Sequence, residues 1–252
     1  MQLTGASSRA FSKGDPEPPL APGTARIYSM RFCPWAERVV LYAAAKGIRA
    51  EVVNINLFNK PPWFLEKFPE GKAPAFEMDG KFLVESAVII EFLDGVYPDS
   101  SILPSDPYRK ARQRLKAEKM TAIPTAFYGI VAVMNDKTNN ESLRKEKMAA
   151  LEAAFDSAEK ELHGEYFGGS SPGFADWVAF PFFERIFLVS LIFPVPSIQT
   201  EGYPGARWPR LSSWWTTMKS HPIVKAVTLP PKMHHDFFAV CQAGKPDVDT
   251  GL

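Results

Sequence analysis

Cys33 is the residue whose type and setting most directly predict chemistry. It follows a stretch with a strand pattern, and Pro34 and Trp35 after it open a stretch with a helix pattern. The first turn of a helix has N–H groups without intrahelical partners and a partial positive charge, and both favour a thiolate. Cysteines at such positions have pKa values of roughly 3.5–7.5 instead of about 8.5. We therefore interpret Cys33 as a nucleophile; the alternative is a buried structural cysteine, because free cysteine is among the most buried residue types.

The motif around Cys33 lacks a second cysteine that could resolve a disulfide. Ala36 stands where a Cys-x-x-Cys motif has its second thiol. A mixed disulfide at Cys33 therefore needs attack by an external thiol before the cysteine is regenerated. The sequence predicts a small thiol as cosubstrate.

Glu85 and Ser86 form a second candidate group, at the predicted start of a helix. The serine hydroxyl and the backbone N–H groups there can receive a carboxylate, and Glu85 can accept a hydrogen bond from an ammonium group. Together they would suit the amino-acid end of a γ-glutamyl group. The alternative, which residue type alone favours, is simple capping of the helix by Ser86.

The elements that position these residues follow from hydrophobic periodicity and turn signals. The pattern predicts, in chain order, strand 26–30, helix 35–46, strand 51–57, helix 61–68, strands 73–78 and 81–84, and helix 87–97. The two strands of the last pair flank Asp79–Gly80, a strong hairpin signal. The first strand–helix–strand unit is expected to be parallel and right-handed. Residues 25–97 are therefore predicted to form a small α/β domain of thioredoxin type.

Pro74 lies inside one of the predicted strands, where it removes an N–H from the ladder. In thioredoxin-like domains such a proline is usually cis and leaves the preceding backbone, here that of Ala73, free to pair with a substrate. We favour a cis peptide bond here over an ordinary edge proline. The backbone of Ala73 is thus a third candidate binding group.

The rest of the chain divides by composition. Residues 1–24 are rich in proline and small polar residues and predict an arm, either disordered or draped over the body. Residues 98–107 are rich in Pro, Ser and Asp and predict a linker. Residues 108–252 have no strand pattern and predict an all-helical domain. Its expected helices are 108–134 with a kink at Pro124, 141–162, 176–191 with Gly173 and Asp176 in a capping arrangement, 211–219 and 222–229.

Composition excludes several classes of function. The formal net charge is +1, so no global field favours nucleic acid or an anionic membrane. The longest apolar stretch, 179–196, is interrupted by Glu184, Arg185 and Ser190, which argues against a membrane span, and residues 1–22 lack the apolar core of a signal peptide. Only Cys33 and Cys241 are cysteines, which predicts a reducing compartment, and hence the cytoplasm, and no zinc site. No glycine-rich phosphate motif supports nucleotide binding.

The chain resembles cytosolic glutathione transferases over nearly its whole length. The resemblance rests on the two-domain order and on the motifs RFCPWAER at 31–38, NKP at 59–61, AP at 73–74 and VESA at 84–87. A cysteine in the catalytic position and a Pro-rich N-terminal arm resemble the omega class, because most other classes use Tyr or Ser there. The resemblance implies a homodimeric thiol transferase that reduces dehydroascorbate and S-glutathionylated or arsenic-containing substrates. Glutathione would be its cosubstrate, with no tightly bound cofactor and no metal.

The resemblance also assigns roles in a glutathione site. Cys33 would form the mixed disulfide with glutathione, and Trp35 would line the pocket. Lys60 would contact the glycyl end, and the backbone of Ala73 would pair with the cysteinyl moiety. Glu85–Ser86 would hold the γ-glutamyl end.

The second-substrate site is assigned less directly. Arg185 matches a position that faces this site in the family. His234 and Cys241 stand in the C-terminal helix region, where mammalian members tend to have aromatic residues. Ala73 also replaces a bulkier aliphatic residue, which matters little if its contact is through the backbone.

Two other functions are compatible with these motifs. One is a transferase that conjugates glutathione to electrophiles, which is disfavoured because a thiolate at Cys33 forms a disulfide with glutathione instead of activating it. The other is a non-enzymatic binding protein or a chloride-channel-like relative with a similar Cys-Pro-aromatic motif. Ala36 and the lack of a span-length apolar segment argue against the second.

Overall fold

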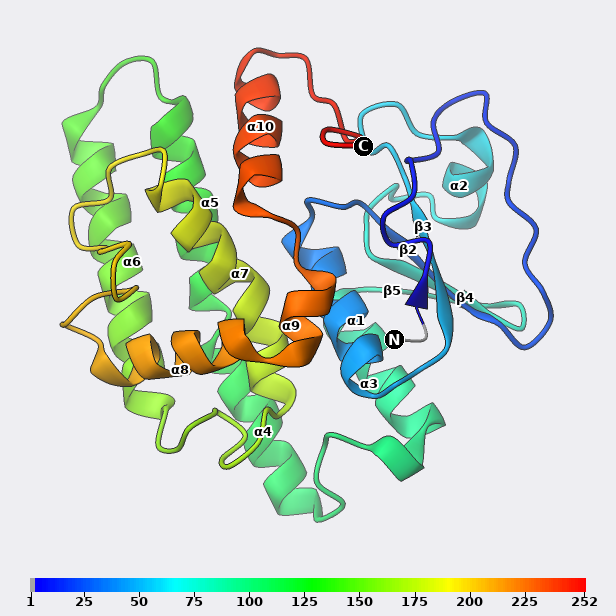
Figure 1. The fold of residues 1–252 in the computed structure, drawn as a ribbon, viewed down its shortest axis with the longest axis horizontal. Helices are drawn as coiled ribbons and strands as arrows, with labels where there is room; N and C mark the ends of the chain where they lie inside the picture. Colours follow the sequence, from blue (N-terminus) through cyan, green and yellow to red (C-terminus); the bar gives the residue numbers. More distant parts are fainter. Residues whose placement is uncertain (1–2) are drawn as a thin grey trace. The chain divides into compact units, whose positions relative to one another are not determined.

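A computed structural model of the chain describes residues 3–252, which fall into two compact units (Figure 1). One unit combines the residues up to Ser101 with Ala226–Leu252, and the other is Ile102–Lys225. The C-terminal segment therefore groups with the first unit, whereas the division by composition joins all of residues 108–252 in one helical domain. No composition signal marks the return of the chain to the first unit, because contacts between residues about 200 positions apart bring it back.

The first unit is built on a five-stranded sheet of order β1-β3-β2-β4-β5. The strands are β1 Leu3–Thr4, β2 Ala25–Ser29, β3 Ala50–Asn54, β4 Ala75–Met78 and β5 Lys81–Val84. β2 runs parallel to β3 and antiparallel to β4, and β4 and β5 form the hairpin predicted around Asp79–Gly80. The thioredoxin-type order predicted for this region is confirmed.

Helices cover both faces of this sheet (Figure 1). The helices of the first unit are α1 Pro34–Ala45, α2 Pro62–Lys67, α3 Ser86–Val96, the short η1 Pro98–Ser100 and, from the end of the chain, α10 Pro231–Gln242. α1 and α3 pack against each other, and α2 lies on the opposite side of the sheet. There Phe64 and Phe68 pack against Tyr28 and Val53. Successive strand residues point to opposite faces, so β2 buries Ile27 on one side and Tyr28 on the other.

The N-terminal arm is part of the first unit's folded structure. β1 pairs in parallel with β3, and Phe11 forms a further parallel bridge to Ile55. The side-chain amide of Asn54 donates hydrogen bonds to the carbonyls of Ala6 and Ser8, at 3.1 and 2.9 Å. The arm therefore adds an outer strand to the sheet, which its proline-rich composition does not predict.

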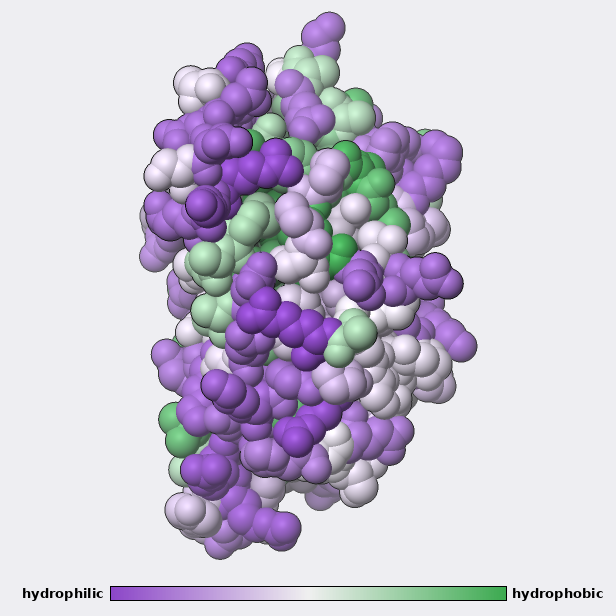
Figure 2. All heavy atoms as spheres, turned by 90° about the vertical axis from the view of Figure 1, so that its left-hand side faces the viewer, coloured by the Kyte–Doolittle hydropathy of each residue, from purple (hydrophilic) through white to green (hydrophobic). Residues whose placement is uncertain are grey.

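The second unit is helical. It contains α4 Pro107–Lys119, α5 Ala122–Asn135, α6 Glu141–Glu161, α7 Phe174–Ser190 and α8 Pro209–Ser220, and α9 Pro222–Val227 follows at its end. The surface in Figure 2, on the side where Figure 1 shows α5 and α6, is mostly hydrophilic, with a hydrophobic area in its upper half. Among the described residues, no helix combines the length and apolarity needed to cross a membrane.

The prediction of one kinked helix over residues 108–134 is wrong in its break point. α4 ends at Lys119, and α5 starts after Thr121, so Pro124 lies in the first turn of α5. Proline fits there because the N–H groups of the first turn have no intrahelical acceptor. Pro124 therefore marks the start of a new helix and not a kink within one.

Asp176 organises the start of α7, as the capping arrangement predicts. Its two carboxylate oxygens accept four hydrogen bonds at 2.7–2.9 Å, from the backbone N–H groups of Phe167, Gly168 and Gly173 and from the indole N–H of Trp214. The carboxylate is fully buried. It thus joins a loop, α7 and α8 at one point, which is a folding role.

Candidate active site

Cys33 is the N-cap residue of α1, and its backbone is extended, with φ −79° and ψ 114°. Its carbonyl accepts the first helical hydrogen bond, from Glu37 N–H at 3.0 Å, and Pro34 occupies the first helical turn. The side chain is half-buried. The cysteine thus stands at the positive end of the α1 dipole, where a thiolate is stabilised.

Ala73 lies next to this cysteine. The Cys33 Sγ is 3.6 Å from the Ala73 carbonyl oxygen. The Ala73–Pro74 peptide bond is cis, as predicted. The pairing of β4 with its two neighbours begins at Ala75, so Ala73 lies just beyond the paired residues. Its backbone is therefore placed at the end of the sheet, beside the start of α1.

A cavity of about 410 Å³ opens beside these residues. It brings together the predicted binding residues Trp35, Lys60, Ala73, Glu85 and Ser86. The other lining residues are Leu57, Glu70, Gly71, Lys72, Pro74 and Val84. None of these was predicted as a binding residue, although Pro74 and Val84 belong to predicted motifs and each of the others lies within three positions of a predicted binding residue. Cavities of this size, with a few polar groups among apolar ones, are typical of small-molecule sites.

Gly71 shapes one wall of this cavity. Its φ is +60°, and a Cβ added to it would lie 2.9 Å from Leu65 Cδ2 and 3.0 Å from Lys60 Cδ. The aliphatic part of Lys60 therefore packs directly over the glycine. A larger residue at position 71 would both strain the backbone and displace this lysine.

Glu85 has a strained backbone, with φ +67° and ψ 116° at the N-cap of α3. Few residues other than glycine adopt positive φ, and such outliers cluster at functional sites. Its carbonyl accepts the hydrogen bond of Ile89 N–H at 3.0 Å, and Ser86 after it is buried at the first helical position. The N-terminal end of α3 thus opens into the cavity through two polar residues.

Trp35 carries a cationic neighbour. The Arg38 guanidinium lies over the indole ring at 4.4 Å from its centroid, a cation–π contact. This contact holds the ring that lines the cavity against the first turns of α1.

His234 and Cys241 both belong to α10 and lie in the first unit. His234 is buried and meets the ring of Phe32 edge to face, at 5.4 Å between centroids. Phe237 stacks on the same ring at 4.1 Å. Burial raises the pKa of Cys241, which lies beside this cluster, so its thiol is a weaker nucleophile at neutral pH than an exposed one. α10 thus covers the residue that precedes Cys33.

Arg185 lies in α7 of the second unit. Its guanidinium is buried and pairs with Glu184 at 2.8 Å, and the other oxygen of Glu184 accepts from Lys219 at 3.0 Å.

Within residues 3–252, no group of three or more His, Cys, Asp or Glu side chains is arranged to hold a metal ion.

The chain matches known proteins in both halves. Residues 27–101 match the N-terminal domain of glutathione S-transferase, and residues 121–222 match its C-terminal domain. It is 44% identical to a probable glutathione transferase omega-2 of Caenorhabditis briggsae over 99% of both chains. It is 45% identical to glutathione transferase omega-1 of Caenorhabditis elegans over 90% of both chains.

More distant relatives agree. Glutathione S-transferase omega-1 of Mus musculus is 34% identical over 99% of this chain and all of its own. The crystal structure of glutathione transferase Omega 1C from Trametes versicolor shares the fold, with a TM-score of 0.74 at 21% identity, over 90% of this chain and 99% of its own. Together with the cysteine at the N-cap of α1, these matches show that the chain belongs to the omega class of the glutathione transferase family.

Proposed function

We propose that this chain is a glutathione-dependent thiol transferase of the dehydroascorbate reductase type, with Cys33 as its nucleophile. The observation that carries the proposal is the place of the Cys33 thiol, at the N-cap of α1 and 3.6 Å from the Ala73 carbonyl on the cavity wall. Most other classes of the family have the hydroxyl of a Tyr or Ser in this position to activate glutathione. A cysteine here can itself exchange with disulfides.

The proposed cycle has two exchanges. The Cys33 thiolate attacks the glutathionyl sulfur of a mixed disulfide, the substrate leaves as its thiolate, and a Cys33–glutathione disulfide forms. The thiolate of a second glutathione attacks the glutathionyl sulfur of that disulfide, which frees the Cys33 thiolate and yields oxidised glutathione. Ala36 offers no internal thiol for the second step, so one free glutathione is consumed for each mixed disulfide that is reduced. With dehydroascorbate as the substrate, two free glutathiones supply the two electrons and, from their thiols, the two protons, and the products are ascorbic acid and oxidised glutathione.

The cavity residues suit the parts of glutathione. We propose that Lys60 binds the glycyl carboxylate, that Glu85 and Ser86 hold the γ-glutamyl end, and that the backbone of Ala73 pairs with the cysteinyl moiety. The spacing supports this assignment, because the cation and the carboxylate line one cavity with Ala73 and Trp35. Arg185 and His234 remain proposals for the second-substrate site. We also propose a cytoplasmic homodimer.

Mass spectrometry after incubation with oxidised glutathione tests the nucleophile. We expect one glutathionyl adduct on the unaltered protein and on Cys241→Ala, and none on Cys33→Ala. Reduced glutathione should remove the adduct. Because the chain has only these two cysteines, the two variants are matched controls for each other. An adduct on Cys241 alone, or none, would contradict the proposal, and retained conjugation of electrophiles by Cys33→Ala would favour the conjugating transferase.

A further inference from the structure

The N-terminal arm makes a continuous set of contacts with the part of the chain that carries Lys60. We call residues 11–19 the strap. Its backbone pairs with the segment after β3: Asn56 N–H donates to the Phe11 carbonyl, and Lys13 N–H donates to the Asn59 carbonyl, both at 2.9 Å. Asn59 directly precedes Lys60. The strap therefore forms backbone hydrogen bonds with the loop that leads into Lys60, which lines the cavity.

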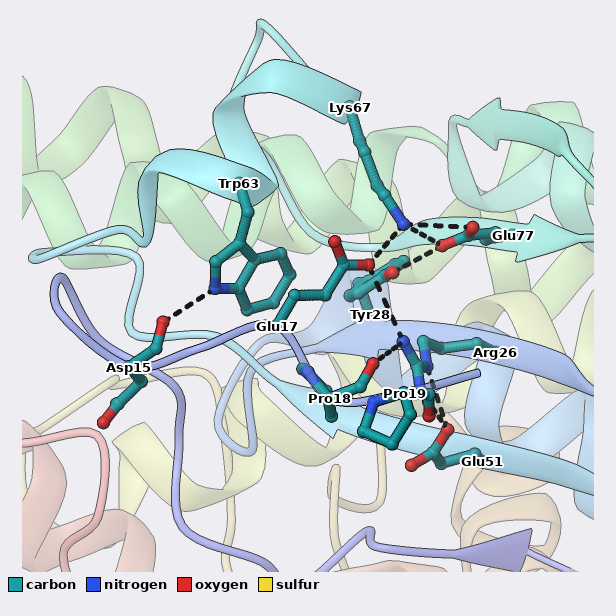
Figure 3. Close-up of polar contacts among 10 residues, drawn as sticks. All are labelled: Asp15, Glu17, Pro18, Pro19, Arg26, Tyr28, Glu51, Trp63, Lys67 and Glu77. Atoms are coloured by element: carbon teal, nitrogen blue, oxygen red, sulfur yellow. Dashed lines mark hydrogen bonds and ion pairs between the residues drawn. The ribbon is translucent and has the colours of Figure 1, made fainter. Parts of the chain in front are cut away.

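The strap then runs along α2 (Figure 3). The indole N–H of Trp63 donates to the Asp15 carbonyl at 2.9 Å, and Lys67 forms a short ion pair with Glu17. Strap positions 13, 15 and 17 thus meet positions 59, 63 and 67. Between the last two contacts, two residues of extended strap and the four helical residues from 63 to 67 both advance roughly 6–7 Å, so the strap stays aligned with α2. The strap can therefore contact α2 both near its start, at Trp63, and at its last residue, Lys67.

The far end of the strap is tied to the sheet. Arg26 on β2 is fully buried and donates to the carbonyls of Pro18 and Pro19, at 2.8 and 2.6 Å. Its guanidinium also pairs with Glu51 on β3 at 2.7 Å. Lys67 in turn pairs with Glu77 on β4 at 2.9 Å. The strap is thus clamped between α2 and the strands, and α2 is held at both ends.

We propose that the strap is a positioning element for glutathione: by holding the 56–60 loop and α2, it keeps Lys60 and the Gly71 wall in the geometry that binds the glycyl carboxylate. This inference rests on the proposed function of the cavity. Lys60 lies between the two strap contacts at 59 and 63, and its stem packs on Gly71 beside Leu65 of α2. A shift of α2 therefore moves this wall. None of the strap residues lines the cavity itself.

Glu17→Lys tests the proposal, because a loosened strap and the added positive charge predict opposite changes in the affinity for glutathione. The new lysine repels Lys67 and Arg26 and loosens the strap, so we expect glutathione to bind about threefold to tenfold more weakly, as for residues coupled through shared contacts. Glutathione is a net anion near neutral pH, so added positive charge alone would strengthen its binding. Isothermal titration calorimetry with reduced glutathione measures the affinity. In turnover, KM for glutathione should rise while kcat stays within about twofold, because Cys33 is untouched.

Glu66→Lys is the matched control. Glu66 is exposed on α2 and is one residue from Lys67, and none of the strap contacts above involves it. The control makes the same charge change on the same helix, so it should bind glutathione at least as well as the unaltered protein. Hydrogen exchange should accelerate in residues 56–67 of Glu17→Lys and not of Glu66→Lys.

A double-mutant cycle with Lys60→Met shows whether the strap acts through Lys60. We expect the effect of Glu17→Lys on glutathione affinity to vanish when Lys60 is already replaced. An unchanged affinity in Glu17→Lys, or the same loss in both backgrounds, would overturn the inference and leave the proposed function intact. Failure of the unaltered protein to bind glutathione would instead overturn the proposed function, and this inference with it.

Discussion

Two features beside Cys33, the start of α1 and the Ala73 carbonyl, act on its thiol in opposite directions. The N-terminal end of α1 favours the thiolate. The Ala73 carbonyl, 3.6 Å from Sγ, can accept a hydrogen bond only from the protonated thiol. A sulfur–oxygen hydrogen bond of this kind is weak. Ionisation of the thiol therefore loses little hydrogen-bond energy and gains the favourable interaction of the thiolate with the N-terminal end of α1. The same carbonyl belongs to the residue proposed to pair with glutathione, so a ligand there would lie next to the Cys33 thiol.

Glu77 is a buried residue whose ionisation should govern part of the acid stability. Burial raises its pKa, but hydrogen bonds from Lys67 and Tyr28 outweigh this and lower it below the ordinary value of 4.5. A carboxylate with a depressed pKa in the folded state stabilises the protein above its unfolded pKa, and this contribution is lost as pH falls through the folded pKa. We expect Tm to fall as the pH drops below about 4.5, the unfolded value.

Glu77→Gln provides the comparison for this pH dependence. The variant should have a lower Tm than the unaltered protein at pH 7, and the difference should shrink in acid, because the unaltered protein then also lacks the charge. Scanning calorimetry between pH 3 and pH 7 measures both curves, with the range chosen as roughly the carboxylate titration region. A difference in Tm that stays constant over this range would contradict the assignment.

At the scale of elements, a buried lysine fastens α1 to α3. Lys46, the C-cap of α1, donates to the Asp94 carboxylate at 2.9 Å and to the carbonyls of Tyr97 and Ser100 at 3.0 Å. Its side chain is 0% exposed. Asp94 also accepts from the hydroxyl of Tyr42 on α1 at 2.7 Å. Both helices have cavity residues in their first turns, so this junction near their other ends fixes how the two N-termini face the site.

Lys46→Met should strongly destabilise the protein. The substitution leaves the Asp94 carboxylate buried without its cationic partner, and breaking a buried pair in this way costs about 3–5 kcal/mol. Urea unfolding measures the change in the free energy of unfolding. Lys232→Met is the control, because Lys232 pairs with Asp236 on the surface of α10; it should lose at most about 0.5 kcal/mol. Equal losses in the two variants would contradict this role of Lys46.

At the scale of the whole molecule, both ends of the chain converge on the segment before Cys33. Arg31 donates to the Thr250 carbonyl at 3.1 Å, and Phe32 stacks on Phe237 of α10. The backbone N–H of Ala10 donates to Asp249 at 2.7 Å. The loop that precedes Cys33 is thus held by residues from the first and the last parts of the sequence.

The proposed homodimer can be tested at this scale. The first unit leaves Phe82 on β5 and Val88 on α3 about half exposed, at 46% and 52%. Exposed large apolar side chains on one unit are compatible with association. Light scattering after gel filtration should give twice the 28.1 kDa mass of the chain. A mass of one chain at micromolar concentration would contradict the homodimer.

The order of elements in the first unit and the place of Cys33 at a helix start could be predicted from the sequence because their signals are local. Cys33–Pro34 marks a strand-to-helix junction, Asp79–Gly80 marks a hairpin, and Gly47 ends a helix. Each signal acts within a few residues, through backbone dihedral preferences and hydrogen bonds at helix ends. The break between α4 and α5 was misplaced because proline is compatible both with a kink and with a first helical turn.

The sequence by itself therefore determined the thioredoxin-type order and the omega-class motifs, and it predicted the nucleophile and the need for an external thiol. Only the tertiary structure decided that the arm becomes an outer strand and a strap along α2, and that residues from Ala226 onward join the first unit. It also decided that His234 is buried against Phe32. These features depend on contacts between residues from about 40 to over 200 positions apart. Such contacts depend on shape and charge matching over the whole fold, and no local pattern of residue types encodes them.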